Sequence, residues 1–183
     1  MTSTRLRGFP PVIDRRCNTL ILGSFPSESS LAKGQYYGHP QNQFWRLVGR
    51  VIDMTLQDME YADRLAALLA HRIGLWDVIG ACEREGSLDG DIRRARQNSF
   101  RRATRIAAGL RRICFNGKTA GRYEPVLAEQ GYETFVLPSS SPANTMAFSV
   151  KLRAWQQALA STDCNSGRPT AHRSPVTSHA SSC

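Results

Sequence analysis

The chain has 183 residues, a formal net charge of +9 and a hydrophobic fraction of 41%. This composition supplies enough apolar side chains for a buried core, which excludes a wholly disordered chain, and the length is that of one ordinary domain. No run of about 18 apolar residues occurs, so a transmembrane helix is excluded, and residues 1–7 lack the apolar segment of a signal peptide, so we expect a cytoplasmic protein.

Short apolar strands alternate with helical patterns along most of the chain. Strands are expected at residues 19–23, 73–78, 112–115 and 134–137, and helices at 41–53, around 65–69, and at 99–110, 118–129 and 145–160. The last helix is expected to bury Val150, Trp155 and Leu159. Repeated β–α units of this kind predict an α/β fold with a parallel sheet that is covered by helices on both faces.

The composition changes at residue 161. Residues 161–183 are rich in Ser, Thr and Pro and contain no Leu, Ile or aromatic residue, so they are expected to form a disordered tail behind a single domain at residues 1–160. The tail carries Asp163, Arg168 and Arg173, which leaves a net charge of +8 on residues 1–160. The basic character therefore belongs to the domain and favours a polyanionic partner such as nucleic acid.

The five cysteines are scattered and form no pattern of metal ligands. No pair has the spacing of a zinc or iron–sulfur site, so neither a metal nor another cofactor is expected. Cys114 stands between Ile113 and Phe115 and is predicted to be a small buried hydrophobe.

Candidate functional segments follow the predicted strands, because ligands bind at the carboxyl ends of the strands in parallel sheets. Gly117-Lys118 is similar to the end of a phosphate-binding loop, but Arg112 stands where that motif needs glycine. Residues 139–141 are three serines, and a triad with His39 and Asp77 is disfavoured because no Gly-x-Ser-x-Gly elbow surrounds them. A proline-flanked serine loop suits close approach to a phosphate backbone instead.

The segment Tyr36-Tyr37-Gly38-His39-Pro40-Gln41-Asn42 is open to two interpretations. The tyrosines can be core residues, with Asn42 capping the helix that follows. Alternatively, an aromatic ring beside a fixed amide can form a pocket for an extruded nucleobase.

Five separated segments carry a family resemblance in their order along the chain. They are Gly23-Ser24-Phe25-Pro26, then residues 37–45, Gly74-Leu75-Trp76-Asp77-Val78 with residues 82–87, Phe115-Asn116-Gly117, and residues 137–144. This set resembles the uracil-DNA glycosylase superfamily and, within it, the hypoxanthine-DNA (deoxyinosine) glycosylases. The resemblance implies a three-layer α/β/α fold with a four-stranded parallel sheet. It also implies a monomeric, cofactor-free and metal-free glycosylase that removes deaminated bases, above all hypoxanthine, from double-stranded DNA and lies at the nucleoid when bound.

The resemblance also implies the roles of site residues. Most branches carry a polar residue where Phe25 stands, and in this branch the catalytic amide matches Asn42, which is expected to position the attacking water. The base pocket is expected to comprise Gly23, Ser24, Phe25, Tyr37 and Asn116, and the DNA-binding loop Pro138, Ser139, Ser140, Ser141 and Asn144.

Several questions stay open at this point. Asn144 either contacts DNA or caps the last helix. Asp77 is either a structural cap, which is the favoured interpretation, or a polar group near the pocket. An arginine cluster either is a solvated helix face or touches DNA; it comprises Arg93, Arg94, Arg96, Arg101, Arg102, Arg105, Arg111 and Arg112. The alternative functions are a uracil or mismatch glycosylase of the same fold and a non-catalytic basic nucleic-acid-binding domain.

Overall fold

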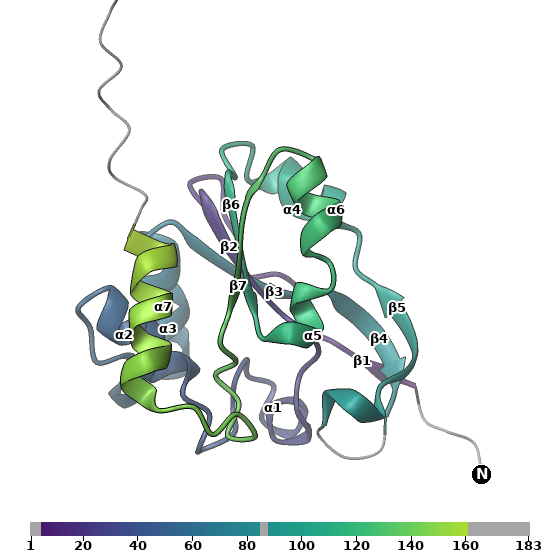
Figure 1. Ribbon diagram of the computed structural model, residues 1–183, viewed down its shortest axis with the longest axis horizontal. Helices are drawn as coiled ribbons and strands as arrows, with labels where there is room; N and C mark the ends of the chain where they lie inside the picture. Colours follow the sequence, from purple (N-terminus) through teal and green to yellow (C-terminus); the bar gives the residue numbers. More distant parts are fainter. Residues whose placement is uncertain (1–4, 85–87, 161–183) are drawn as a thin grey trace, which may run out of the picture.

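The computed structural model describes residues 5–84 and 88–160 (Figure 1). The expected tail, residues 161–183, lies outside the described residues.

A four-stranded parallel sheet forms the middle of the molecule. Its strands are β2 (Thr19–Gly23), β3 (Ile73–Asp77), β6 (Arg112–Asn116) and β7 (Glu133–Leu137), in the spatial order β3-β2-β6-β7. All five residues of β2, β3 and β6 are buried, as continuous apolar strands of a covered parallel sheet should be. The predicted α/β fold and its four parallel strands are confirmed.

Helices cover both faces of this sheet (Figure 1). One layer holds α2 (Phe44–Val51), α3 (Tyr61–Ala70) and α7 (Phe148–Ala160), and the other holds α4 (Phe100–Ile106), α5 (Lys118–Gly121) and α6 (Glu124–Glu129). Alternate residues of β2 serve the two layers, since Ile21 packs with the core under α2 and α7 whereas Leu20 and Leu22 pack with the core under α4 to α6. The short helices α1 (Glu28–Lys33) and η1 (Leu56–Asp58) follow β2 and α2 along the chain.

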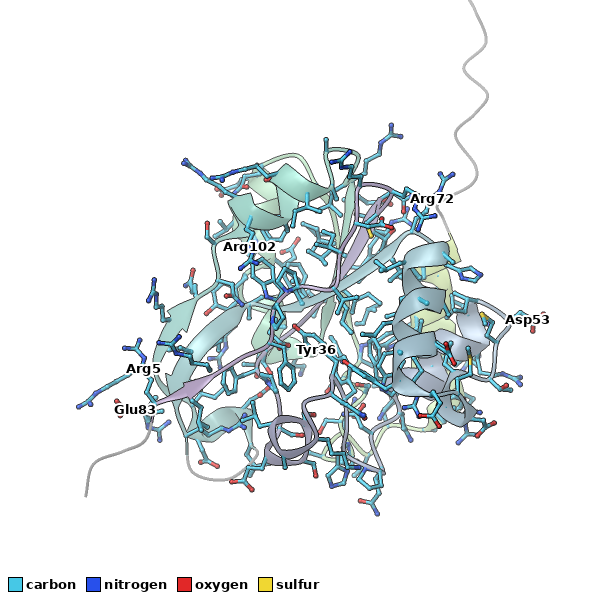
Figure 2. The ribbon with its side chains drawn as sticks, turned by 180° about the vertical axis from the view of Figure 1, so that it is seen from behind. Arg5, Tyr36, Asp53, Arg72, Glu83 and Arg102 are labelled. Carbon is cyan, nitrogen blue, oxygen red and sulfur yellow. The ribbon has the colours of Figure 1, made fainter. Side chains whose placement is uncertain are left out.

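A second, antiparallel sheet lies beside the first and was not predicted. It pairs β1 (Leu6–Arg7), β4 (Ile79–Glu83) and β5 (Arg93–Gln97) in the order β1-β4-β5, with η2 (Asp89–Asp91) before β5. The strand expected at residues 73–78 therefore ends at Asp77, and the chain passes through Val78 into the second sheet. Figure 2 shows Arg5 and Glu83 at the far end of this sheet, while Tyr36 lies in the middle of the molecule.

The arginine cluster divides among different elements. Arg93, Arg94 and Arg96 lie on the exposed strand β5, so of the two alternatives the solvated helix face is wrong for them. The strand β5 was not predicted because all of its residues are exposed, and its sequence therefore lacks the alternation of apolar and polar residues that marks a half-buried strand. Arg112 is buried and forms an ion pair with Glu133 at 2.6 Å, which removes it from any surface for DNA.

Several predicted helices differ from the structure in their bounds, and two of the differences have a clear cause or consequence. The helix expected at residues 118–129 is divided into α5 and α6, because Pro125 has no N–H to donate and is tolerated only in the first turn of a helix. The last helix begins at Phe148, and Val150 is 41% exposed, contrary to prediction, whereas Trp155 and Leu159 are buried. The inward position one residue later is taken by Lys151, which is fully buried.

The remaining expectations concern membranes, metals and cysteines. Among residues 5–84 and 88–160, no helix is long and apolar enough to cross a membrane, and no group of three or more His, Cys, Asp or Glu side chains could hold a metal ion. Cys114 is fully buried as predicted, and burial raises the pKa of its thiol to about 12.

Candidate active site

A cavity of about 670 Å³ opens at the carboxyl ends of the parallel strands. Its volume lies within the range of roughly 300–1,000 Å³ that is usual for small-molecule pockets. Every predicted site residue lines it, namely Gly23, Ser24, Phe25, Tyr37, Asn42, Asn116, Pro138, Ser139, Ser140, Ser141 and Asn144. These residues come from four separate parts of the chain, and the parallel sheet brings them together because its strand ends share one edge.

Asn42 both lines this cavity and fixes the start of α2. Pro40 stands in a turn in which the N–H of Asn42 donates to the carbonyl of His39 at 2.9 Å. The side-chain Oδ1 of Asn42 accepts a hydrogen bond from the N–H of Phe44 at 3.0 Å. The helix therefore begins at Phe44 and not at residue 41, where it was predicted to begin. The two interpretations of Asn42 are therefore compatible: the bond to the helix N-terminus orients a carboxamide that faces the cavity.

Tyr37 has one ring face packed against the core. Its ring stacks on Phe44 with centroids 3.8 Å apart and planes inclined by 13°. Its backbone has φ +53°, a left-handed conformation that is strained for a tyrosine and is held by the residues on either side. The backbone on either side is fixed by hydrogen bonds: the N–H of Tyr36 donates to the hydroxyl of Tyr61, and the N–H of Gly38 donates to the hydroxyl of Ser30. The ring of Tyr37 is thus a rigid wall of the cavity.

The loop that follows β2 is held by two charged side chains. Ser24 donates its hydroxyl proton to Asp89 at 2.6 Å, which ties the loop to η2. Arg84 donates to the carbonyl of Pro26 at 2.6 Å, and its guanidinium lies 5.1 Å from the centre of the Phe25 ring. Phe25 is only 7% exposed, so it is fixed at this wall of the cavity.

Asn116 and Ser140 form a reciprocal pair. The Nδ2 of Asn116 donates to the hydroxyl of Ser140 at 2.8 Å, and the N–H of Ser140 donates to Oδ1 of Asn116 at 2.8 Å. Both residues are buried, and the pair joins the end of β6 to the loop after β7. Asn116 therefore lines the cavity, but its carboxamide is engaged in positioning the loop from Pro138 to Asn144, which we call the serine loop.

Lys151 links the serine loop to the segment that contains Asn42 and Gln43, directly before α2. Its ammonium group donates to Oε1 of Gln43 at 2.9 Å and to the carbonyl of Asn144 at 2.8 Å. The N–H of Gln43 in turn donates to the carbonyl of Ser140 at 3.0 Å. Burial lowers the pKa of Lys151, yet two oxygen acceptors compensate the buried ammonium.

Asn144 closes its own loop. Its Nδ2 donates to the carbonyl of Ser139 at 3.0 Å, and its Oδ1 accepts from the N–H of Met146 at 3.2 Å. Because α7 begins only at Phe148, Asn144 holds the serine loop and does not cap the first turn of that helix.

The cavity is also lined by residues that were not assigned to the predicted site. They are Pro26, Ser27, Ser30, Tyr36, Asp77, Leu88, Asp89, Lys118, Val136, Leu137, Ala143 and Met146. Asp77 differs from the others in having a buried carboxyl group with a shifted pKa. It is 4% exposed, and burial together with the nearby charge of Asp89 raises the pKa of this carboxyl to about 8. Its position directly after an apolar strand was the available signal. His39 instead accepts from the N–H of Gln41 through Nδ1, which gives no support to a serine triad.

Comparisons with known proteins agree with this geometry. Residues 10–162 match the family model of the uracil DNA glycosylase superfamily. A protein from Methanosarcina acetivorans named hypoxanthine DNA glycosylase is 55% identical over 138 residues, which cover 75% of this chain and 87% of the relative. One of the same name from Methanosarcina barkeri is 47% identical over 153 residues, which cover 84% of this chain and 97% of that protein. The solution NMR structure of a candidate uracil DNA glycosylase from M. acetivorans superposes with a TM-score of 0.78 at 49% identity, covering 85% of this chain and 97% of that one.

Proposed function

Because the chain belongs to the uracil DNA glycosylase superfamily, we propose that it is a DNA glycosylase that hydrolyses the N-glycosidic bond of deoxyinosine and releases hypoxanthine. The observation that carries this proposal is the convergence of every predicted site residue on one cavity, in a chain that is 55% identical over 138 residues and 47% identical over 153 residues to proteins named hypoxanthine DNA glycosylase. Phe25 stands where most branches place a polar residue, which favours hypoxanthine over uracil as the main substrate.

The proposed chemistry needs no strong base. Cleavage of the bond between C1′ and N9 passes through an oxocarbenium-like state, which captures water readily. Oδ1 of Asn42 has a second lone pair beside the one that the N–H of Phe44 uses, so it can accept a proton of the attacking water and hold that water in place. A neutral amide cannot remove the proton outright, so Asn42 positions the water and the proton leaves to solvent as the bond forms.

Extrusion of the base is offset by stacking in the cavity. Tyr37 presents a ring that Phe44 holds from behind, and stacking of a base on an aromatic ring contributes about 1–3 kcal/mol. Inosine pairs are weaker than normal pairs, which lowers the cost of extrusion further. The serine loop, Pro138 to Asn144, is proposed to contact the DNA backbone at the mouth of the cavity, together with the exposed ammonium of Lys118.

The proposed function extends to the oligomeric state of the protein, its location in the cell and the extent of its catalytic domain. We infer that it acts as a monomer on double-stranded DNA, in the cytoplasm and at the nucleoid when bound. Residues 1–160 are proposed to form the whole glycosylase domain, so a chain that ends at residue 160 is expected to retain excision.

A panel of modified duplexes tests the proposed activity. The protein is incubated with duplexes that carry one inosine, xanthine, uracil or unmodified base, and alkali then converts abasic sites to strand breaks. We expect breaks at inosine. Breaks only at uracil or at mismatched thymine would support the uracil or mismatch alternative, and salt-sensitive binding without any abasic product would support the non-catalytic domain.

A further inference from the structure

Asp77 carries a buried carboxyl group that no structural role explains. It ends β3, it lines the cavity, and its side chain is 4% exposed. Its Oδ2 is buried and has no hydrogen-bond partner among the described residues. The backbone of Asp77 is held by the pairing of β3 with β2 and by Nδ2 of Asn98, which donates to the carbonyl of Asp77 at 2.9 Å. An unsatisfied buried polar atom costs stability, so its presence in a cavity wall points to a ligand that satisfies it.

A second unsatisfied group faces the same small volume. The hydroxyl of Tyr37 is buried and makes no hydrogen bond within 3.5 Å in the described part of the chain, although the side chain of Asn116 lies near enough to interact with it. Both groups meet above Gly23: a Cβ atom at this position would collide with Oδ1 of Asp77 and lie 2.9 Å from the Tyr37 hydroxyl. Glycine at position 23 therefore allows the carboxyl of Asp77 and the hydroxyl of Tyr37 to approach the backbone of β2 closely.

The surroundings favour the neutral form of the carboxyl. Asp89 on η2 contributes a nearby negative charge, Arg84 after β4 contributes an opposing positive charge, and the phenols of Tyr36, Tyr37 and Tyr61 lie close enough to be influenced by Asp77. Burial and Asp89 outweigh Arg84, and they raise the pKa of Asp77 to about 8. A neutral carboxylic acid has both a donor and an acceptor, whereas a carboxylate can only accept.

We propose that Asp77, as a neutral carboxylic acid, binds the edge of the extruded base on which a ring N–H adjoins a carbonyl. This assignment rests on the proposed function, because hypoxanthine presents such an edge at N1 and O6. The carbonyl oxygen of Asp77 accepts from N1–H, and its hydroxyl donates to O6, so two hydrogen bonds form and no proton is transferred.

The donor also acts on the reaction. Negative charge spreads over the base as the glycosidic bond breaks, and a hydroxyl donor at O6 stabilises that charge. An ionised carboxylate at the same place would repel the departing base. Excision should therefore decline when Asp77 loses its proton, which is the opposite of the behaviour of a general base.

Single-turnover excision of inosine from a duplex, measured from about pH 6 to about pH 9.5, tests the assignment. We expect the rate of the natural protein to fall above about pH 8, near the pKa of Asp77. Asp77→Leu, which is similar in size and has no polar atom, should reduce excision roughly 100-fold at every pH. Asp77→Asn keeps a donor and an acceptor but does not ionise, so it should be about tenfold slower at pH 7 and lack the decline above pH 8 that Asp77 causes. Comparison on one duplex cancels any titration of the DNA.

Asp89→Asn is the matched variant, since it removes the neighbouring charge and leaves Asp77 in place. The pKa of Asp77 should then decrease, and the alkaline decline should begin at lower pH. The carboxyl ¹³C signal of Asp77 in the natural protein provides a readout that needs no variant, and we expect it to report a neutral acid at pH 6.

The outcomes separate the two claims. A natural protein that does not excise inosine refutes the proposed function and the role of Asp77 with it. An active protein refutes Asp77 alone if its rate rises through pH 8, if Asp77→Leu excises as fast as the natural protein, or if the ¹³C signal shows a carboxylate at pH 6.

Discussion

Two variants separate the two roles of Asn42, whose single carboxamide both accepts from the N–H of Phe44 at the start of α2 and is proposed to hold the attacking water. Asn42→Ala removes both roles. Asn42→Ser keeps a side-chain oxygen that can accept from the N–H of Phe44 but does not reach as far into the cavity. The pair of variants therefore measures the catalytic contribution apart from the effect on the helix.

The magnitudes follow from the contacts. Loss of the hydrogen bond from the N–H of Phe44 costs about 1 kcal/mol, which lowers the Tm of a domain of this size by roughly 2–4 °C in Asn42→Ala. Asn42→Ser should retain most of that stability. Both variants should lose at least about 100-fold in the rate of inosine excision, since water is no longer held at the reacting carbon.

Single-turnover excision, thermal unfolding and binding to an inosine duplex provide the three measurements. DNA affinity should stay close to that of the natural protein in both variants, because neither removes a charge. If Asn42→Ser excises inosine at the natural rate, the carboxamide has no catalytic role and the reasoning about the attacking water is wrong.

Three further predictions concern the supports of the cavity. Ser140→Ala removes the hydroxyl that accepts from Asn116 and should lower the free energy of unfolding by roughly 1–3 kcal/mol, measured by urea denaturation. A loss below the error of that measurement would show that the reciprocal pair contributes nothing. Lys151→Met leaves two oxygen acceptors unpaired and should cost a similar amount, about 1–3 kcal/mol, with slower excision as the serine loop loosens. Arg153→Met, at an exposed position of the same helix, is the control and should change stability by less than about 0.5 kcal/mol; equal effects of the two would contradict the linking role. The raised pKa of Asp77 means that the folded chain keeps a proton that the unfolded chain releases, so this group lowers stability progressively as the pH rises from about 4 to about 8. Urea midpoints at pH 5 and pH 8 should therefore differ more in the natural protein than in Asp77→Asn, and equal differences would show that Asp77 is ionised in the folded state.

The sequence by itself determined the framework of this protein. The strand at Thr19–Gly23 was predicted with its observed bounds, because a continuous apolar run that ends at glycine is a local signal that the buried sheet leaves unchanged. The loops that form the site were also predictable, since the carboxyl ends of parallel strands must share one edge. The break in the helix at residues 118–129 could have been predicted as well, because Pro125 has the same local effect in any fold.

Only the tertiary structure decided how the site side chains are used. Asn116 meets Ser140 across 24 positions of sequence, and Lys151 meets Gln43 across 108 positions, so no local pattern reveals that these polar groups satisfy one another. Lys151 therefore takes the inward position on α7 that the apolar pattern assigned to Val150. The protonation of Asp77 likewise depends on burial and on charges that only the folded chain places around it. Local propensity decides where elements form, whereas the state of a buried polar group is set by partners that are distant in the sequence.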